Sequence, residues 1–333
     1  MKSISRRGFL AGSAAALAVM AFRPDRLQAG LLDRLLGRPR KPMSPITANA
    51  DFYITSSGGT PRLKAESWSL HVKGLVRNPV TLTYEDLLKR TNVAMISTLE
   101  CIGNPIGGNS IGTAEWEGVK LSEILDEAGA SHNAVDLVLR GADGYSDSFP
   151  AKRAMRDEVL LVTRMNGVPL PAEHGFPTRV IVPGIYGMKN VKWLTELELV
   201  EKDYKGYWET RGWSDEAIVK VRSRIDQPVD GETVTGKSAV IRGIAVGGLY
   251  GVARVEVSTD GGIHFHDAQL EPPLSPYAWR FWAYTWPAPS AGHHTLIVRA
   301  TDTRGVAQEQ APGQTFPNGA AGLHEISVTV TAT

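Results

Sequence analysis

The sequence contains a single cysteine, Cys101, in a chain of 333 residues. One cysteine excludes disulfides within the chain, C-x-x-C redox pairs, cysteine-based zinc sites and the covalent attachment of a c-type haem. Any redox chemistry in this chain therefore has to use a bound cofactor or a lone thiol.

An excess of charge is missing as well, because 36 Lys and Arg residues stand against 35 Asp and Glu residues, for a formal net charge of +1. A chain without a basic field is not expected to hold nucleic acid or an anionic membrane. We therefore predict no nucleic-acid partner.

The sequence also has no long apolar run at its amino terminus. The apolar stretch over residues 9–22 is shorter than the roughly 20 residues that a membrane-spanning helix needs. Arg6 and Arg7 precede this stretch, and residues 5–10 match the twin-arginine export pattern. We predict a twin-arginine signal peptide over residues 1–29, export of the folded protein to the periplasm, and a proline-rich basic linker over residues 30–48.

Glycine and proline are abundant instead, with 34 and 20 residues, which favours short strands and turns. The chain length predicts two domains. In the first, over residues 49–215, the capping-box pattern at Thr83 predicts a helix start, and apolar residues at helical spacing over 121–128 predict a helix that ends at Gly129. Strand-like runs at 136–139 and 179–182 complete an α+β pattern.

The carboxyl-terminal part, residues 220–333, has a different pattern. Apolar side chains alternate with polar ones at Ala253, Val255 and Val257, Asp260-Gly261 is a hairpin signal, and the alternation resumes over residues 263–266. Short strands without a convincing helix predict an all-β immunoglobulin-like sandwich. The alternation places His264 and His266 on the outer face, where two solvated histidines are the better interpretation than a metal pair.

Cys101 lies in the stretch "STLECIGNPIGGN", directly after the apolar run 93–96 and before several glycines. Three interpretations are open for it. It is an inert residue of a turn, or a nucleophile if the fold brings His174 close enough to take its proton. The third interpretation is a ligand of a soft, redox-active metal, whose other ligands an organic cofactor would have to supply.

A second cluster, residues 174–194, combines Arg179 and Lys192 with Gly184 and Gly187. A guanidinium forks onto phosphate and a lysine adds a compact charge, so the pair is suited to an anionic cofactor. Two surface cations near a turn are the simpler alternative.

The order of these motifs resembles the sulfite oxidase family of molybdopterin-dependent oxidoreductases. The motifs in chain order are Cys-x-Gly-Asn after a strand, then His-Gly-Phe-Pro-x-Arg, then Val-Lys-Trp, then Asp-Tyr-Lys-Gly. The resemblance implies an α+β molybdopterin-binding domain over residues 49–215 and a dimerisation-type domain over residues 220–333. It also implies a molybdenum–molybdopterin cofactor and oxygen-atom transfer with two-electron redox chemistry at the metal.

The resemblance assigns roles to individual residues. Cys101 matches the metal ligand, and Tyr204 matches a tyrosine on the substrate-facing side, where a phenol can donate a hydrogen bond or relay a proton. The positions that match cofactor-binding residues of the family are Tyr53, Ile54, Asp143, His174, Arg179, Asn190, Val191 and Lys192.

The sequence departs from the family at its sulfite pocket. Pro105 and Ile106 stand where sulfite oxidases have arginines, and an early pocket arginine falls near Thr55. Burying an anion such as sulfite without cations is costly. A reductase of sulfoxides or other S- or N-oxides is therefore an alternative within the enzyme class.

Further expectations concern partners. No haem motif is present, so a separate electron-transfer partner such as a periplasmic cytochrome is expected beside a small-molecule oxygen donor or acceptor. The sandwich makes a homodimer possible. Outside the redox enzymes, the alternatives are a binding protein with a lapsed catalytic half and a cysteine hydrolase that uses Cys101 and His174.

Overall fold

The computed structural model describes residues 44–236, 238–287 and 289–331. The predicted signal peptide, residues 1–29, lies outside the described residues, as does the linker up to residue 43. The described end of that linker is part of the fold, because Thr47 N donates to Thr113 O at 2.7 Å and Trp279 Nε1 donates to Pro45 O at 3.0 Å. None of the described helices is long and apolar enough to cross a membrane.

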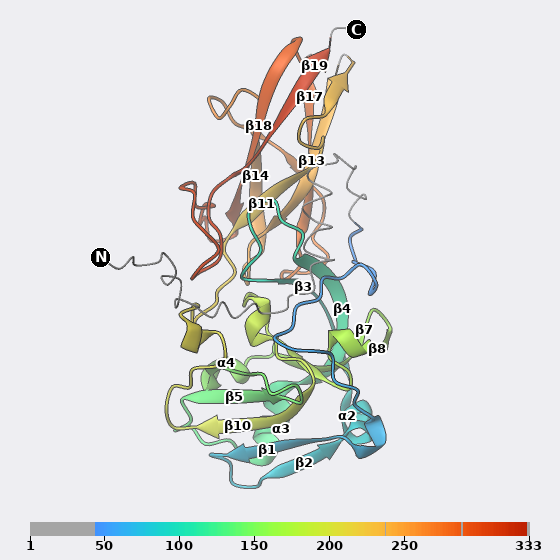
Figure 1. Ribbon diagram of the computed structural model, residues 1–333, viewed down its shortest axis with the longest axis vertical. Helices are drawn as coiled ribbons and strands as arrows, with labels where there is room; N and C mark the ends of the chain where they lie inside the picture. The colour runs from blue at the N-terminus through green and yellow to red at the C-terminus, as the bar shows by residue number, and fades with distance from the viewer. Residues whose placement is uncertain (1–43, 237, 288, 332–333) are drawn as a thin grey trace, which may run out of the picture. The chain divides into compact units, whose positions relative to one another are not determined.

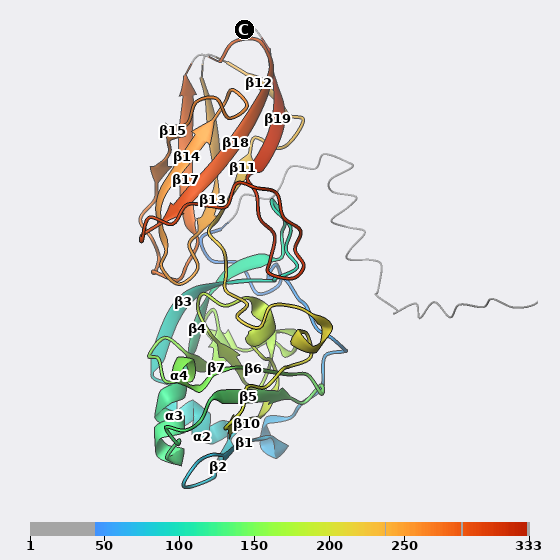
Figure 2. The ribbon, with the colours of Figure 1, turned by 90° about the vertical axis from the view of Figure 1, so that its left-hand side faces the viewer.

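The first domain contains a five-stranded sheet in which a parallel pair stands among antiparallel neighbours. Its strands lie side by side in both ribbon views (Figures 1 and 2). In spatial order they are β2 (Val80–Thr83), β1 (Ser69–Gly74), β10 (Leu194–Val200), β5 (Asp136–Gly141) and β6 (Ser146–Pro150). The strand predicted at 136–139 is confirmed as part of β5.

Two amphipathic helices pack on the core of this sheet. Helix α2 (Tyr84–Arg90) begins with the predicted capping box, in which Thr83 N donates to Asp86 Oδ2 at 2.9 Å and Asp86 N donates to Thr83 Oγ1 at 3.2 Å. Helix α3 (Leu121–Ala128) buries its predicted apolar face and ends at Gly129, which has a φ of 68°. Both helix predictions are confirmed.

The second sheet of this domain carries the cysteine. Its strands are β3 (Val93–Glu100), β4 (Ile111–Lys120), β7 (Leu160–Met165) and β8 (Val168–Pro169), with β9 (Arg179–Ile181) paired to β7. Strands β3 and β4 form a long antiparallel hairpin whose register runs from Val93 opposite Gly118 to Glu100 opposite Ile111. The glycine-rich stretch 101–110 is the loop of that hairpin, and β9 is the strand predicted near 179–182.

Short helical segments connect these strands. They are α4 (Ala151–Ala154), η1 (Ala65–Ser67), η2 (Ala172–His174), η3 (Gly187–Lys189) and η4 (Glu209–Arg211).

The carboxyl-terminal domain consists of two sheets, and its described residues contain no helix. One sheet has the strands β11 (Arg222–Gln227), β13 (Ser238–Val246), β17 (Arg280–Pro287) and β16 (Gln269–Leu270). The other has β12 (Thr233–Thr235), β19 (His324–Thr331), β18 (Gly292–Asp302), β14 (Val252–Ser258) and β15 (His266–Asp267). Side chains from both sheets, such as Ile241, Trp282, Val298 and Val328, share one core, so the two sheets pack face to face.

The predicted alternation in this domain is only partly right. A bulge in β14 between Val252 and Arg254 buries Val252 and exposes Ala253. Ile263 is 75% exposed and lies outside any strand, because the Asp260 side chain organises the turn and accepts hydrogen bonds from the backbone N–H groups of Ile263 and His264 at 3.1 and 2.9 Å. His264 and His266 are exposed, as predicted.

Candidate functional site

Cys101 follows β3 directly and begins the hairpin loop. Its backbone anchors the loop, since Cys101 N donates to Ser110 O at 3.0 Å and Asn104 N donates to Cys101 O at 2.9 Å. Burial raises the pKa of the thiol, an effect that hydrogen bonds with the Gly103 backbone and the Thr55 side chain oppose. The free thiol is therefore protonated near neutral pH, and a metal would have to displace its proton.

His174 is hydrogen-bonded to the backbone of Asn49. Its Nε2 atom donates to Asn49 O at 2.8 Å, which fixes the tautomer that carries the proton on Nε2. Burial lowers the pKa of this imidazole, and the neighbouring Arg179 lowers it further. Among the described residues, no hydrogen bond joins His174 to Cys101, so the structure gives the cysteine hydrolase no support.

Tyr53 links the cysteine to the second predicted cluster. Burial raises the pKa of its phenol, Cys101 raises it further, and the Arg179 charge lowers it. A Cβ atom added to Gly187 would lie 2.8 Å from Tyr53 Oη, so only glycine lets this hydroxyl reach η3. The structure thus places Tyr53 close enough to both Cys101 and Arg179 for their charges to change its pKa.

Arg179 is a buried cation. Its side chain is 4% exposed, and its guanidinium donates to His174 O at 3.0 Å and to Asn190 O at 2.9 Å. Among the described residues it has no carboxylate partner, and its Nε atom has no hydrogen-bond partner. Burial lowers the pKa of the guanidinium to about 10. An uncompensated buried charge is costly, so this position is suited to an anionic ligand.

Lys192 is the second cation at this place. Its Nζ atom donates to Glu173 O at 2.9 Å and lies 4.1 Å from the centre of the Trp193 ring. Burial, with help from Arg179, lowers the pKa of this amine to about 7. Gly175 has a φ of 117°, and a Cβ atom there would lie 3.1 and 3.2 Å from the Cβ atoms of Arg179 and Lys192. The two cations therefore share one glycine-lined cradle.

Asp143 lies at the edge of this cradle. A Cβ atom on Gly141 would lie 2.7 Å from Asp143 Oδ1 and 2.8 Å from Lys192 O, and the Asp143 charge opposes the lowering of the Lys192 pKa. Asp143 Oδ1 also accepts a hydrogen bond from Tyr145 N at 3.1 Å.

Three predicted cofactor residues contribute differently from the cations. The Asn190 side chain is used within the fold, where Oδ1 accepts from Val182 N at 2.7 Å and Nδ2 donates to the carbonyls of Ile185 and Tyr186. The Val191 side chain is buried in the core of the first sheet, and Ile54 is 38% exposed. The Asn190 backbone is used within the fold as well, because its N–H donates to Gly187 O at 3.1 Å and its carbonyl accepts from Arg179 at 2.9 Å.

Tyr204 lies in the neighbourhood of β5 and β6. Its hydroxyl is 2.8 Å from Ser146 Oγ and accepts from Arg140 Nη1 at 3.4 Å, while the Arg140 guanidinium also pairs with Glu196 and Glu198. The Tyr204 hydroxyl is therefore already hydrogen-bonded within the fold. A direct role of Tyr204 at the site requires its hydroxyl to exchange these partners.

The sequence interpretation missed a buried ionic cluster around Lys189. Its Nζ atom donates to Asp147 Oδ1 and Glu209 Oε1, each at 2.9 Å, and lies 3.5 Å from Asp215 Oδ1. Tyr145 Oη donates to Asp147 Oδ2 at 2.7 Å and lies 2.9 Å from Met188 O. No motif could reveal this cluster, because its members are far apart in the sequence and meet only through η3 and η4.

We expect the wild-type protein to lose stability as the pH rises through about 7, and the Asp147→Asn variant to lack this loss. Burial raises the pKa of Asp147 to about 7, whereas an unfolded aspartate titrates near 4. The folded protein therefore keeps a proton that the unfolded chain has lost, and the stability from this proton is complete below about pH 4 and disappears as the pH rises through about 7.

The measurement is the free energy of unfolding in urea between about pH 5 and 8. The value for the wild type minus that for Asp147→Asn should fall across this range, while the exposed control Asp157→Asn should give a flat difference. A flat difference for Asp147→Asn would contradict the raised pKa.

An apolar cluster adjoins the cysteine loop and was also missed. Ile102 and Met188 are buried in it, and Trp208 and Trp213 pack against them. Trp213 meets Phe316 of the second domain edge to face, with ring centres 5.3 Å apart. Ile102 follows Cys101 directly, so this side of the loop is apolar and aromatic rather than cationic.

These residues fit a metal that is held mainly by an anionic organic cofactor. Among the described residues, no group of three His, Cys, Asp or Glu side chains could hold a metal ion, so Cys101 could supply only one soft ligand. The unpaired Arg179 guanidinium and the Lys192 amine provide the complementary cradle for an anion. A chain with this arrangement has the site of a molybdopterin-type oxidoreductase.

The comparison with known families supports this class. Residues 57–208 match the oxidoreductase molybdopterin-binding domain, and residues 216–316 match the Mo-co oxidoreductase dimerisation domain. The exact domain bounds, residues 49–215 and 220–333, stay a prediction.

Known proteins narrow the class to a family. Human mitochondrial sulfite oxidase is 33% identical over 300 residues, which cover 76% of this chain and 55% of the human protein. Sulfite oxidase of Arabidopsis thaliana is 32% identical over 267 residues, which cover 65% of this chain and 68% of the plant protein. The chain belongs to the sulfite oxidase family of molybdopterin-dependent oxidoreductases, although it spans only about half the length of the human relative.

A solved structure shares this fold. The sulfane dehydrogenase SoxCD of Paracoccus pantotrophus superposes with a TM-score of 0.75 at 23% identity, covering 99% of this chain and 98% of that one. At this identity the likeness establishes the fold alone.

Proposed function

We propose that this chain catalyses oxygen-atom transfer coupled to a two-electron redox change, with a molybdenum–molybdopterin cofactor in the site of Cys101, Tyr53 and Arg179. The observation that carries the proposal is the buried, unpaired Arg179 guanidinium in the same neighbourhood as the only thiol. When bound, the cofactor supplies the two-electron redox couple.

The chain's own residues hold and orient that group. The Cys101 thiol loses its proton on binding and serves as a thiolate ligand. Arg179 and Lys192 bind the anionic end of the cofactor, and a nearby phosphate raises the pKa of Lys192 and restores its charge. The Tyr53 hydroxyl keeps its proton, because its pKa is raised, and is available as a donor between the two ends of the site.

The surroundings of Cys101 favour an uncharged oxygen donor or acceptor. Thr55, Pro105 and Ile106 carry no charge, and the apolar cluster of Ile102 and Met188 borders the loop. Sulfite would lose its hydration there with no cation at residues 55, 105 or 106 to replace it. A second candidate is therefore the reductase of sulfoxides or other S- or N-oxides, which takes up two electrons and two protons and releases water.

We also propose that the second domain is an immunoglobulin-like sandwich that forms a homodimer, and that the protein works in the periplasm with a separate electron-transfer partner. The dimerisation-domain match over residues 216–316 and the twin-arginine pattern at residues 5–10 support these proposals.

The test is metal and pterin analysis of the chain produced with its amino terminus intact in cells that make molybdopterin. We expect about one molybdenum and one pterin per chain. Sulfite oxidation with ferricyanide and sulfoxide reduction with a reduced viologen dye then separate the two candidate reactions. A folded protein that holds neither molybdenum nor pterin would contradict the proposal and favour a binding protein.

A further inference from the structure

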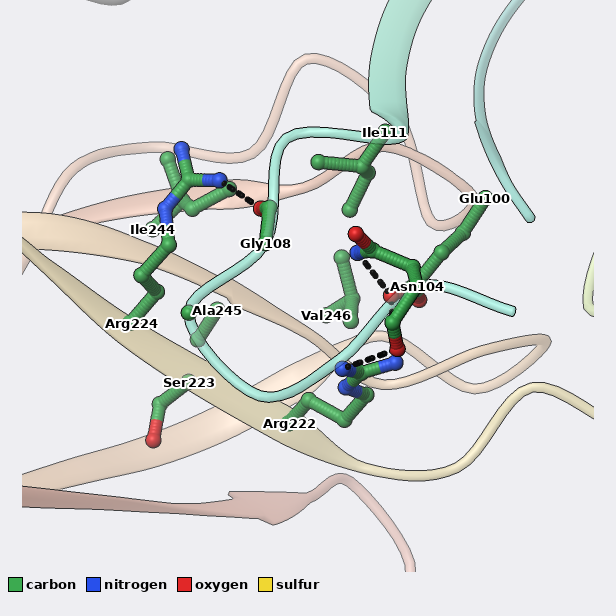
Figure 3. A pocket seen from close by; sticks show the side chains of 11 residues that line it. Glu100, Asn104, Gly108, Ile111, Arg222, Ser223, Arg224, Ile244, Ala245 and Val246 are labelled. Carbon is green, nitrogen blue, oxygen red and sulfur yellow. Dashed lines mark hydrogen bonds and ion pairs between the residues drawn. The ribbon is translucent and has the colours of Figure 1, made fainter. Parts of the chain in front are cut away.

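The cysteine loop is held from the second domain by β11. Figure 3 shows Arg222 pointing toward Glu100 and Asn104, and Arg224 pointing toward Gly108, on either side of the loop. Glu100 is the last residue of β3 and directly precedes Cys101. Strand β11 is the first strand of the carboxyl-terminal domain, so the contact joins the two domains at the cysteine.

Arg222 makes three contacts with this loop. Its Nη1 atom donates to Glu100 Oε1 at 2.5 Å, and its Nη2 atom donates to the carbonyls of Asn104 and Pro105 at 3.1 and 2.9 Å. The two charged side chains are buried, with 7% and 2% of their surface exposed. A guanidinium is suited to this task, because its planar fork addresses a carboxylate and two carbonyls at once.

The loop itself closes onto the same carboxylate. Asn104 Nδ2 donates to Glu100 Oε1 at 2.8 Å, and Asn104 Oδ1 accepts from Ser110 N at 3.0 Å. Arg224 adds a further contact from β11, donating to Gly108 O at 2.5 Å. The cavity that remains between the loop and β11 is only about 20 Å³, room for one water molecule.

We propose that Arg222 is a positioning residue for the Cys101 thiol, through which the second domain sets the geometry of the metal ligand. The proposal rests on the proposed role of Cys101 as a ligand. Arg222 touches neither the thiol nor a cofactor residue among its described contacts, and it acts through Glu100 and through the loop carbonyls. Without the Arg222 guanidinium, Glu100, Asn104 and Pro105 each lose a hydrogen bond. The Cys101 side chain between them is then held less firmly.

The test uses the fact that the chain has one thiol. The full-length chain is produced in cells that make no molybdopterin, and the rate of Cys101 alkylation by iodoacetamide is measured for wild type and Arg222→Gln. We expect the variant to react about tenfold faster, since local opening of the loop becomes more frequent. Arg299→Gln is the matched control, because Arg299 makes a two-pronged ion pair with Glu256 within the second domain, and its alkylation rate should equal that of wild type.

In the molybdenum-loaded protein, Arg222→Gln should shift the sulfur-to-metal charge-transfer absorption and lower kcat by about 10- to 100-fold, as loss of a residue that orients a metal ligand does. KM should stay within about twofold, because the Arg222 side chain is used by Glu100 and by the carbonyls of Asn104 and Pro105. An unchanged alkylation rate together with an unchanged spectrum would overturn the proposal. If wild type binds no molybdenum, the proposed function fails, whereas faster alkylation still reports the positioning contact.

If Arg222→Gln does not fold, Arg222→Lys tests the same positioning role. Lysine keeps the charge opposite Glu100 but cannot fork onto the carbonyls of Asn104 and Pro105. Faster alkylation in this variant supports the positioning role, and a rate equal to that of wild type refutes it.

Discussion

Cys101→Ser is expected to reduce turnover by roughly a thousandfold or more while the protein stays folded, as loss of a central member of a catalytic unit does. A serine hydroxyl is a hard donor that keeps its proton near neutral pH, so it cannot replace a thiolate on a soft metal. The fold should tolerate the change, because the bonds that anchor the loop at this residue come from its backbone N–H and carbonyl.

The measurements are steady-state turnover, molybdenum and pterin content, and thermal unfolding of wild type and variant. We expect the pterin to be retained in part, because Arg179 and Lys192 bind its anionic end without the thiol. The melting temperature should change by no more than about 2 °C, as for a substitution that leaves hydrogen bonds and packing intact. Turnover equal to that of wild type would show that Cys101 is not a ligand.

Arg179→Met is expected to weaken cofactor binding by about a hundredfold, the loss that corresponds to one or two charge-assisted hydrogen bonds. The apo-protein, however, should lose little stability. Arg179 is buried among carbonyls, has no carboxylate partner in the described part of the chain, and has a pKa lowered to about 10 by burial. Methionine fills a similar volume and removes a buried charge, and this gain offsets the loss of the hydrogen bonds to the carbonyls of His174 and Asn190.

Cofactor retention after extensive dialysis and unfolding of the apo-protein measure these two effects separately. Arg140→Met is the matched control, because the Arg140 guanidinium is satisfied by the carboxylates of Glu196 and Glu198. It should lower stability modestly and leave retention unchanged. A large loss of apo-protein stability in Arg179→Met, with normal retention, would make Arg179 a structural residue instead.

Strand β11 connects the second domain to the cysteine loop of the first. In sequence, the second domain begins more than a hundred residues after Cys101, and its resemblance to a dimerisation-type domain implies association rather than chemistry. In the structure its first strand supplies Arg222 and Arg224 to the cysteine loop. Removal of this domain is therefore expected to release the loop as well as to remove the proposed dimer contact.

Local patterns predicted much of the fold. The capping box at Thr83, the apolar stripe over 121–128 and the left-handed Gly129 depend on contacts a few residues apart, so the sequence alone contained them. The alternation around residue 253 failed for a physical reason, since a bulge between Val252 and Arg254 reverses the faces of the strand. A bulge arises from pairing with β18, which no local pattern records.

The sequence by itself determined the family, the lone thiol and the two cations of the cradle, because these are residue types in a fixed order. Only the tertiary structure decided that Arg179 has no carboxylate partner among the described residues, that Asn190 is used within the fold, and that Tyr204 is bound by Ser146 and Arg140. It also decided that Lys189 and Arg222 meet buried carboxylates. The physical reason is that pairing and burial depend on groups brought together from distant strands, and desolvation then sets the cost and the strength of each charge.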